Sequence, residues 1–316
     1  LDTAPKNSTI QTGMAAQWAD FRGTAYAEGG VMTGTANTNN GVTSAAIPFA
    51  AEEGTLYWAV NAGTGYSSNA VSNPILVDGA VVVYTGTRIL KIDKDTGAIL
   101  KEGTMAGKSS FAINNPTYAE GVILVGLSDG RIQAFNAETL QSLWIYHDPL
   151  EGQPNSPITV CGDYLYTGFW RSEESPANFV CLSITDEDPA RTDEEKTACW
   201  YWTTPGGYYW AGAYACEDYV LVGTDDGAES GVNGTSRILS FRKDETRQKS
   251  RSAGARAARP WRPEKLARVF RTDRADLFYD EGRISLLGEG GRYDRYAHGA
   301  QDLPSRHGKY EHASLL

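Results

Sequence analysis

The stretch of this chain that decides its fold reads Asn73-Pro74-Ile75-Leu76-Val77-Asp78-Gly79-Ala80-Val81-Val82-Val83. A second copy runs from Asn115 to Val125, 42 residues further along, and two later copies begin at Ser156 and Ala213. Each copy has a short apolar run, a turn at Gly or Asp, and a second apolar run, which together predict two antiparallel strands. Self-similarity at this period is typical of repeat folds, in which each unit packs against its neighbours.

The second half of the repeating unit also recurs. Arg88–Ile92 matches Arg131–Phe135 and Arg237–Phe241, and Phe179–Ile184 takes this place in the third copy. These segments alternate with period two, as half-buried strands do. A turn and a last strand follow. Four strands in each unit of this length are typical of the blade of a β-propeller.

The predicted fold class is all-β: a partial, incomplete β-propeller of four-stranded antiparallel blades, with about four blades present. Three full blades are expected at 73–104, 115–147 and 156–203, and a fourth begins at 211 and loses its last strand near 243. A closed ring has at least four blades and usually more. We therefore expect this chain to hold roughly half of a ring.

The unit "apolar pair, polar turn, Thr-Gly, then Trp" resembles the repeat of PQQ-like (quinoprotein-type) β-propeller proteins. Gln17–Gly23 and Asn39–Val42 are similar to the segment that precedes the first blade in that family, so the resemblance covers residues 17–243. It implies a bacterial protein that is exported or held at the cell surface. It also implies that Thr55–Ala59 is the outer strand that closes the ring onto the final blade.

The copies depart from the family pattern at two places. The last strand of a copy ends near Trp144 or Trp202, but Lys101 stands at the place of Trp144 in the first copy. Leu140 stands where Gly97 stands one copy earlier. The resemblance is therefore evidence for the fold rather than for a particular chemistry.

Composition divides the chain into an N-terminal lead-in of residues 1–54, the partial propeller of residues 55–243, and an anomalous basic tail of residues 244–316. Residues 1–241 hold 12 Lys+Arg and 28 Asp+Glu, a balance of −16, whereas residues 242–316 hold 17 and 11, a balance of +6. The tail lacks the strand pattern and contains 13 of the 19 Arg. We expect it to be disordered or translated out of frame; the alternative is a basic tail for an anionic partner.

Charge and hydropathy also limit the classes of partner that we expect. The acidic part of the chain would repel phosphates, so we expect no nucleic-acid partner. The longest aliphatic run, around Val81–Val83, is far shorter than the ~20 residues of a spanning helix, so no membrane-spanning segment is expected. Because the chain begins at Leu1, we expect a mature product or a fragment.

The four cysteines are spaced too widely for a zinc site, because none stands in a Cys-x-x-Cys pair. They are Cys161, Cys181, Cys199 and Cys216. Cys181 and Cys199 fall on the two outer strands of one predicted blade, so a disulfide between them is possible in an oxidising compartment. The alternative is that all four are free, partly buried thiols.

Aromatic residues crowd the turn Pro205-Gly206-Gly207. They are Trp200, Tyr201, Trp202, Tyr208, Tyr209, Trp210, Tyr214 and Tyr219. One interpretation is packing between blades, which favours large rings. The other is a ligand-binding platform for a sugar ring or a peptide, formed by Tyr208, Tyr209 and Trp210.

Acidic residues form two groups. Asp225, Asp226 and Glu229 precede Asn233 in a Gly-rich loop, and their oxygens could coordinate Ca²⁺, although the spacing is not that of an EF-hand and a solvated loop is the alternative. A second group lies between strands and is expected to be a solvated loop. Its members are Asp186, Glu187, Asp188, Asp193, Glu194 and Glu195.

No catalytic residues are assigned. His147 is the one histidine of the patterned region, which argues against a Ser-His-Asp triad or a multi-histidine metal site there. We therefore expect a non-catalytic, extracellular or cell-surface propeller for binding or scaffolding, with a protein or carbohydrate ligand and no cofactor. Two alternatives remain open. One is a fragment of a quinoprotein oxidoreductase that uses PQQ and calcium, and the other is a scaffold of the outer-membrane-assembly type.

Overall fold

The structure is a computed structural model. It describes residues 10–21, 23–30, 32–33, 56–63, 70–109, 115–208, 210, 212–228 and 234–242, and four strands between 270 and 295. The chain divides into two compact units, Leu1–Ser252 and Ala253–Leu316. Each unit is described by itself.

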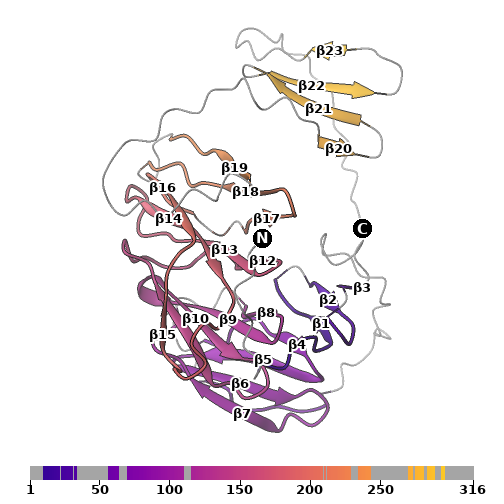
Figure 1. Ribbon diagram of the computed structural model, residues 1–316, viewed down its shortest axis with the longest axis vertical. Coiled ribbons are helices and arrows are strands. Elements are labelled where there is room, and N and C mark those ends of the chain that lie inside the picture. The colour runs from indigo at the N-terminus through magenta and orange to yellow at the C-terminus, as the bar shows by residue number, and fades with distance from the viewer. Residues whose placement is uncertain are drawn as a thin grey trace. The chain divides into compact units, whose positions relative to one another are not determined.

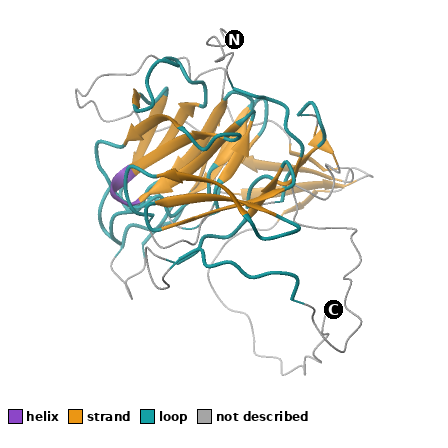
Figure 2. Ribbon diagram, turned by 90° about the horizontal axis from the view of Figure 1, so that it is seen from below, coloured by secondary structure: helices purple, strands orange, loops and turns teal. Residues whose placement is uncertain are grey.

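The first unit is built from antiparallel sheets that form the blades (Figure 1, Figure 2). The first blade contains β4 (Ile75–Val77), β5 (Ala80–Thr85), β6 (Arg88–Asp93) and β7 (Ile99–Thr104). The second contains β8 (Thr117–Ala119), β9 (Val122–Leu127), β10 (Arg131–Asn136) and β11 (Ser142–His147). The third contains β12 (Thr159–Cys161), β13 (Tyr164–Gly168), β14 (Ala177–Ser183) and β16 (Trp200–Thr204). The prediction of an all-β, partial propeller is confirmed.

A tight turn joins the first two strands of the first and second blades because the repeat places two left-handed residues there. Asp78 and Gly79 have φ of 49° and 69°, and Glu120 and Gly121 have φ of 47° and 83°. Two consecutive positive φ values are typical of the type I′ hairpin turn, whose twist matches that of the strands. The glycine that marks each of these copies in the sequence is thus required by the turn.

The third strand of each complete blade ends at a side chain that caps the next turn. Oδ1 of Asp93 and Oδ1 of Asn136 each accept backbone N–H groups from two of the residues that follow, and Oγ of Ser183 accepts one. Such side-chain-to-backbone bonds stabilise turns. These caps define equivalent positions, and the first residue after each is Lys94, Ala137 or Ile184.

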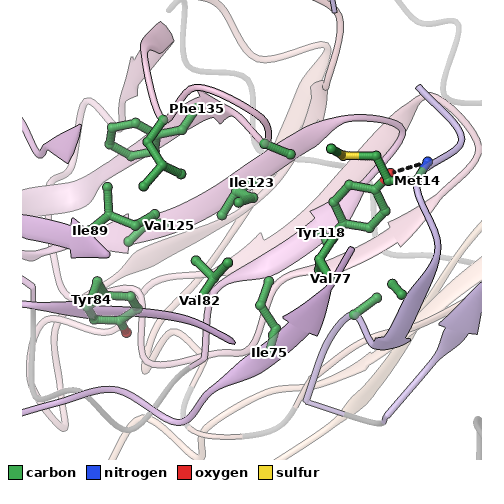
Figure 3. Packing of buried hydrophobic residues seen from close by; sticks show 14 of the residues in the cluster. Met14, Ile75, Val77, Val82, Tyr84, Ile89, Tyr118, Ile123, Val125 and Phe135 are labelled. Atoms are coloured by element: carbon green, nitrogen blue, oxygen red, sulfur yellow. Dashed lines mark hydrogen bonds between the residues drawn. The ribbon is translucent and has the colours of Figure 1, made fainter. Parts of the chain in front are cut away.

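A large core lies between the first and second blades. Figure 3 shows side chains from β4–β6 facing those from β8–β10. The core includes Ile75, Val77, Val82, Tyr84, Ile89, Tyr118, Ile123, Val125 and Phe135. The backbone N–H of Met14 donates to the hydroxyl of Tyr118 at 3.1 Å, so the N-terminal segment covers one end of this core. Residues far apart in the sequence are thereby joined.

The lead-in adds three short strands to the first blade. They are β1 (Ala16–Trp18), β2 (Ala25–Tyr26) and β3 (Met32–Thr33), and the sheet order is β3-β2-β1-β4-β5-β6-β7. Because β1 pairs antiparallel with β4, the first strand of this blade is not left as a bare sheet edge.

The acidic insert of the third blade is only in part the solvated loop that the sequence led us to expect: Glu187, Asp193 and Glu195 are exposed, but the insert also forms a buried contact. It contains β15 (Glu194–Lys196), which leaves the third blade and pairs in parallel with β11 of the second. Asp186, Glu194 and Lys196 are buried. Residues 184–198, called the strap below, therefore join the second and third blades. The insert was misread because a parallel strand on a neighbouring blade leaves no local pattern.

The fourth blade has three strands among the described residues: β17 (Tyr214–Ala215), β18 (Tyr219–Gly223) and β19 (Ile238–Arg242). Residues 243–250, where a last strand would follow, lie outside the described part of the chain. In that part the one helical element is the 3-10 turn Ser128–Gly130, and no helix there is long and apolar enough to cross a membrane.

The second unit contains a four-stranded antiparallel sheet to which the sequence analysis assigned no strands. Its strands follow one another in order: β20 (Phe270–Thr272), β21 (Ala275–Asp280), β22 (Arg283–Gly288) and β23 (Tyr293–Arg295). The rest of residues 244–316 lies outside the described part of the chain. The expectation that this tail is disordered or out of frame stays a prediction.

Candidate binding groove and its supporting contacts

Residues 56–63 lie on the face of the first blade without forming a strand. Trp58, Val60 and Ala62 pack against the apolar face of β5 and β6. This differs from the ring-closing strand expected at Thr55–Ala59, of which Thr55 lies outside the described residues. A fourth strand needs a third strand of the same blade beside it, and no strand pairs with 56–63 in the described part of the chain.

Trp58 nevertheless occupies the position of an outer-strand tryptophan. Its Nε1–H donates to the carbonyl of Lys94 at 2.9 Å. Nε1–H of Trp144, on β11, donates to the carbonyl of Ile184 at 3.2 Å. Lys94 and Ile184 are equivalent, because each is the first residue after the third strand of its blade. Trp58 thus docks on the first blade as Trp144 docks on the third.

A groove of about 660 Å³ opens beside Trp58. This volume is within the range of ligand-binding pockets. The residues that line the groove come from β1, the turn after β1, residue 58, residues 73–76 at the start of β4, β5, and residue 115 before β8. Its residues are Trp18, Phe21, Trp58, Asn73, Pro74, Ile75, Leu76, Val81 and Asn115.

The rings of the groove are accessible although they belong to a packed sheet. Trp18 is 43% and Phe21 36% exposed. The ring of Trp18 lies over Gly23, where an added Cβ would come within 2.7 Å of it. Phe21 likewise approaches Gly212 of the fourth blade, where an added Cβ would lie 2.5 Å from the ring. Both glycines therefore allow the rings to hold these positions.

Two amide side chains add polarity to the groove. Asn73 and Asn115 are the first residues of successive sequence copies and both line it. Asn115 is 7% exposed, and its Nδ2 has no hydrogen-bond partner among the described residues. A buried amide without a partner costs free energy, which a ligand acceptor would recover. The sequence analysis missed this site; its signal was the repeated Asn-Pro at the start of two copies.

Two of the three predicted ligand-binding aromatics lie in the described part of the chain, and they differ in exposure. Tyr208 is fully buried, packs 5.3 Å from the ring of Phe179 and donates its hydroxyl to the carbonyl of Trp202. Burial raises the pKa of Tyr208. A fully enclosed ring offers no face to a ligand, so Tyr208 is not placed to stack on one. Tyr209 lies outside the described residues, and Trp210 is 61% exposed.

Much of the aromatic cluster packs between the third and fourth blades. The ring of Trp200 lies 5.0 Å from that of Phe241 on β19, and Phe179 stacks on Phe241 at 5.8 Å. Cys181 is opposite Trp200 in the sheet, as Ala134 is opposite Trp144 in the second blade. Strand register therefore makes Trp200, rather than Trp202, the counterpart of Trp144.

Asp225 and Asp226 cap their own loop. The carboxylate of Asp225 accepts the N–H of Asp226, whose carboxylate accepts the N–H groups of Ala228 and Gly234. Glu229 lies outside the described residues. No group of three His, Cys, Asp or Glu side chains suited to a metal occurs in the described part of the chain. The oxygens at this loop thus already serve backbone donors, and calcium binding there stays a prediction.

The two cysteines of the predicted disulfide are neighbours and are not joined by a disulfide in this structure. The N–H of Cys199 donates to the carbonyl of Cys181 at 2.8 Å. Cys181 is buried on β14, whereas Cys199 is exposed at the end of the strap. The thiol of Cys181 hydrogen-bonds to Cys199 and lowers the pKa of Cys199 to about 7. Whether the pair forms a disulfide stays a prediction.

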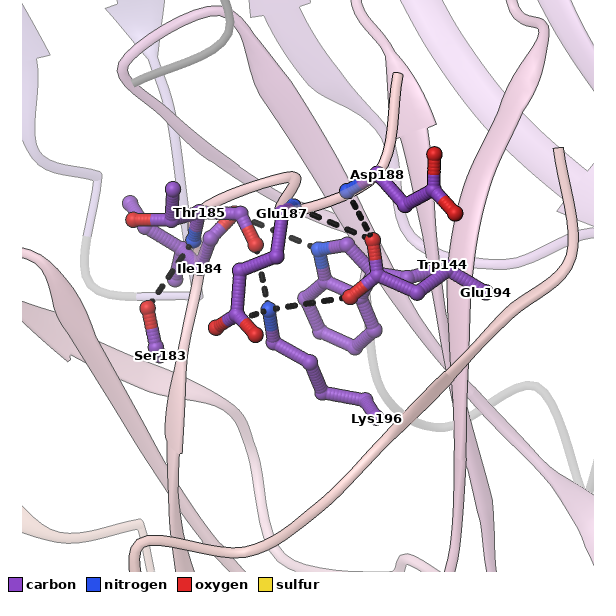
Figure 4. Close-up of polar contacts among 8 residues, drawn as sticks. All are labelled: Trp144, Ser183, Ile184, Thr185, Glu187, Asp188, Glu194 and Lys196. Carbon is purple, nitrogen blue, oxygen red and sulfur yellow. Dashed lines mark hydrogen bonds and ion pairs between the residues drawn. The ribbon is translucent and has the colours of Figure 1, made fainter. Parts of the chain in front are cut away.

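A buried lysine holds the two ends of the strap together and lies against the second blade (Figure 4). The ammonium of Lys196 donates to the carbonyl of Thr185 and lies 3.0 Å from Oε1 of Glu187 and 3.6 Å from Oε1 of Glu194. It also sits 5.3 Å from the ring centroid of Trp144. Because a buried cation needs partners, this cluster indicates a structural role for the acidic insert.

A second buried polar cluster joins the same blades. The carboxylate of Asp148 accepts hydrogen bonds from Nδ2 of Asn178 at 3.0 and 3.2 Å and from the hydroxyl of Tyr146 at 2.9 Å. Asp148 is fully buried, and this desolvation raises its pKa despite the donors. A raised carboxyl pKa can mark a catalytic acid, but here each contact joins strands of the scaffold.

Comparison with known protein families gives a match over the region of the blades. The family model for this repeat, described as outer membrane protein assembly factor BamB, matches residues 44–174. That range contains the first two complete blades. This stretch of the chain is a PQQ-like β-propeller repeat. The resemblance to this repeat is thereby confirmed, whereas a bacterial, exported or cell-surface origin stays a prediction.

Each of the similar solved structures aligns with only part of this PQQ-like propeller. BamB from Moraxella catarrhalis is 11% identical, with a TM-score of 0.37 over 70% of this chain and 62% of that one. A quinohemoprotein alcohol dehydrogenase from Pseudomonas putida HK5 is 14% identical, with a TM-score of 0.40 over 51% and 29%. A europium-containing methanol dehydrogenase is 18% identical, with a TM-score of 0.34 over 44% and 26%. No curated protein matches significantly.

This PQQ-like propeller thus spans only part of the similar structures, about a quarter of the methanol dehydrogenase and less than two thirds of BamB. Because every one of these TM-scores is below 0.5, none of these structures assigns an activity, a cofactor or a partner to this chain.

Proposed function

We propose that this protein is a non-catalytic binding propeller that holds an extended apolar segment of a protein partner in the groove beside Trp58. One observation carries the proposal: accessible aromatic rings converge there on a buried amide that has no partner among the described residues. Trp18 and Phe21 supply the ring faces and Asn115 supplies the donor. A peptide offers both apolar side chains for the rings and a backbone carbonyl for Nδ2 of Asn115.

The chemistry of the lining favours binding over turnover. The described lining residues are aromatic, aliphatic or amide side chains and proline. None of these groups is an acid, a base or a nucleophile near neutral pH. Aromatic rings bury large apolar areas, and a few polar groups then set orientation, as in binding sites generally.

Charge narrows the class of partner. Residues 1–241 carry a balance of −16, so the surroundings of the groove favour a segment with basic flanks. The description of the matching family, an assembly factor for outer membrane proteins, also supports a protein partner and an exported location. A carbohydrate, which would stack on the same rings, and PQQ with calcium are the competing ligands.

The test uses the full chain and its tryptophan fluorescence. The probes are an apolar peptide flanked by lysines, the same peptide flanked by glutamates, and a set of neutral oligosaccharides. We expect binding of the lysine-flanked peptide, weaker binding of the glutamate-flanked one, and a loss of at least ten-fold in affinity for Trp18→Ala, because an aromatic anchor contributes on the order of 2 kcal/mol. The matched control is Trp210→Ala, which removes an exposed tryptophan that does not line the groove.

The other outcomes decide between the alternatives. Loss of binding in Trp210→Ala but not in Trp18→Ala would place the ligand at the aromatic turn and overturn the groove. Binding of oligosaccharides alone would replace the protein partner by a carbohydrate. Reduction of a redox dye after addition of PQQ and Ca²⁺ would show that the protein is an oxidoreductase.

A further inference from the structure

We propose that Cys181 and Cys199 form a redox site, in which an exposed attacking thiol and a buried resolving thiol close a disulfide that anchors the strap to the third blade. The proposal does not depend on the ligand of the groove. It starts from geometry. Cys181 lies on β14 opposite Trp200. The N–H of Cys199, the residue before Trp200, donates to the carbonyl of Cys181 at 2.8 Å. This backbone bond sets Cys199 directly beside Cys181 at the point where β16 begins, and a disulfide requires such a close approach of the two backbones.

The two thiols differ in a way that suits their roles. Cys199 is exposed and Cys181 is 2% exposed. A dissolved reagent therefore reaches Cys199 first. Cys181 is held against Cys199 by the sheet and shielded by the rings of the third and fourth blades. An accessible thiol next to a protected one is the usual arrangement of a redox pair.

The charged surroundings also favour the thiolate of Cys199. The thiol of Cys181, the backbone of Ser183 and the positive charge of Lys196 lower its pKa to about 7, while partial desolvation and the charge of Glu187 oppose this effect. An ordinary cysteine has a pKa of about 8.5, so a much larger fraction of Cys199 is nucleophilic at neutral pH. On the side of Cys181, Tyr166 is the facing titratable group, and burial raises its pKa, so it stays neutral there.

The reaction needs an oxidant, which we take to be a low-molecular-weight disulfide. The thiolate of Cys199 attacks one sulfur of the reagent; a mixed disulfide forms and one reagent thiolate leaves. The thiol of Cys181 then gives its proton to that thiolate, and its sulfur attacks the sulfur of Cys199 and expels the second reagent thiolate. The two protein sulfurs are oxidised to one disulfide, and the reagent disulfide is reduced to two thiols, the second of which takes its proton from water.

The consequence falls on the strap. Cys199 follows β15, which pairs with β11 of the second blade. A disulfide to β14 would fix the end of the strap covalently to the third blade, in addition to the backbone bond already there. We therefore expect oxidation to stabilise the contact between the second and third blades.

The experiment exposes the full chain to glutathione buffers of increasing oxidised fraction, followed by alkylation of free thiols and peptide mass spectrometry. The background is Cys161→Ser with Cys216→Ser, which removes the other two thiols and leaves the pair. We expect a peptide cross-linked between Cys181 and Cys199 and no bound glutathione. In Cys181→Ala we expect one glutathione on Cys199, and in Cys199→Ser none on Cys181. Protection of the strap from proteolysis should rise on oxidation and return to its initial level on reduction.

A second readout separates redox chemistry from packing. In the reduced background, alkylation of Cys199 should be half-maximal near pH 7. It should be about three-fold faster at that pH than for an ordinary exposed thiol, after allowing for the lower nucleophilicity of a low-pKa thiolate. Cys181→Ala should move the midpoint to higher pH. Stable glutathione on Cys199 beside an unreacted Cys181, or no oxidation of the folded background, would overturn the proposal.

Discussion

The ammonium group of Lys91 in the first blade donates a hydrogen bond to the carbonyl of Ala137 in the second, at 3.1 Å. Ala137 is the first residue after the third strand of its blade, as are Lys94 and Ile184. Trp58 and Trp144 donate to these other two carbonyls, whereas the outer strand of the first blade has Lys101 in place of a tryptophan. A buried lysine thus supplies the donor that the missing tryptophan would have supplied.

Removing this donor should destabilise the contact between the first and second blades. Lys91→Met keeps the length and apolar stem of the side chain but leaves the carbonyl of Ala137 without this donor, so we expect a loss of about 1–3 kcal/mol in the free energy of unfolding. The matched control is Lys101→Met, directly opposite Lys91 in the sheet but exposed, which should change it by less than about 0.5 kcal/mol. Urea unfolding of both variants measures this. Equal losses would contradict the role of Lys91.

The two tryptophan donors should differ in importance because they differ in burial. Trp144 is fully buried and also lies against Lys196, so Trp144→Phe should cost about 2–4 kcal/mol through the lost hydrogen bond and the smaller ring. The hydrogen bond of Trp58 is exposed to water, so Trp58→Phe should cost less than about 1 kcal/mol. Guanidinium unfolding gives the comparison. A larger loss for Trp58 would show that residues 56–63 carry more of the stability than their exposure indicates.

The close approach of the first two blades at Gly103 predicts a steric effect. A Cβ at this position would lie 2.6 Å from the carbonyl oxygen of Leu140 and 2.8 Å from Cγ2 of Ile89. We expect Gly103→Ala to destabilise the protein by about 1–3 kcal/mol, because the neighbours are backbone and core atoms. Gly223→Ala is the control: it lies in β18 with no atom within 4 Å of its Cβ position. Thermal melts of the pair should separate by several degrees; coincident melts would refute the predicted clash.

The raised pKa of Asp148 predicts a pH dependence with a definite sign. Its folded-state pKa lies above the unfolded value, so the folded state binds the proton more readily and stability from this group rises as the pH falls. Asp148→Asn removes this titration while keeping an oxygen acceptor for Asn178. The stability of the wild type relative to the variant should therefore increase from about pH 7 towards about pH 4, the ordinary range of carboxyl groups. Urea midpoints across this range test it, and a difference that shrinks on acidification would mean that the charged form is the preferred one.

The architecture within each blade could be predicted from the sequence because its causes are local. Period-two alternation selects strands, and the Asp-Gly and Glu-Gly turns select the hairpins. Even a departure from the pattern kept the local geometry: Leu140, at the place of Gly97, adopts φ of 57° where the glycine has 72°. Leu140 is 2% exposed, and its burial in the core offsets the strain of a left-handed backbone.

The candidate groove, in contrast, could not be predicted from the sequence. Asn115 lies far along the sequence from Trp18 and Phe21, and no spacing rule places the three around one groove. The predicted platform failed for Tyr208 because an exposed ring and a ring packed between blades have the same sequence signature.

By itself, the sequence determined the all-β class, the repeat length, the strands of three blades and the turns that join them, because these depend on contacts between residues close along the chain. Only the tertiary structure decided how the blades meet: the pairing of β15 with β11, the bond from Lys91 to Ala137 and the burial of Tyr208. These contacts depend on the register and stacking of whole sheets, which join residues that share no local pattern.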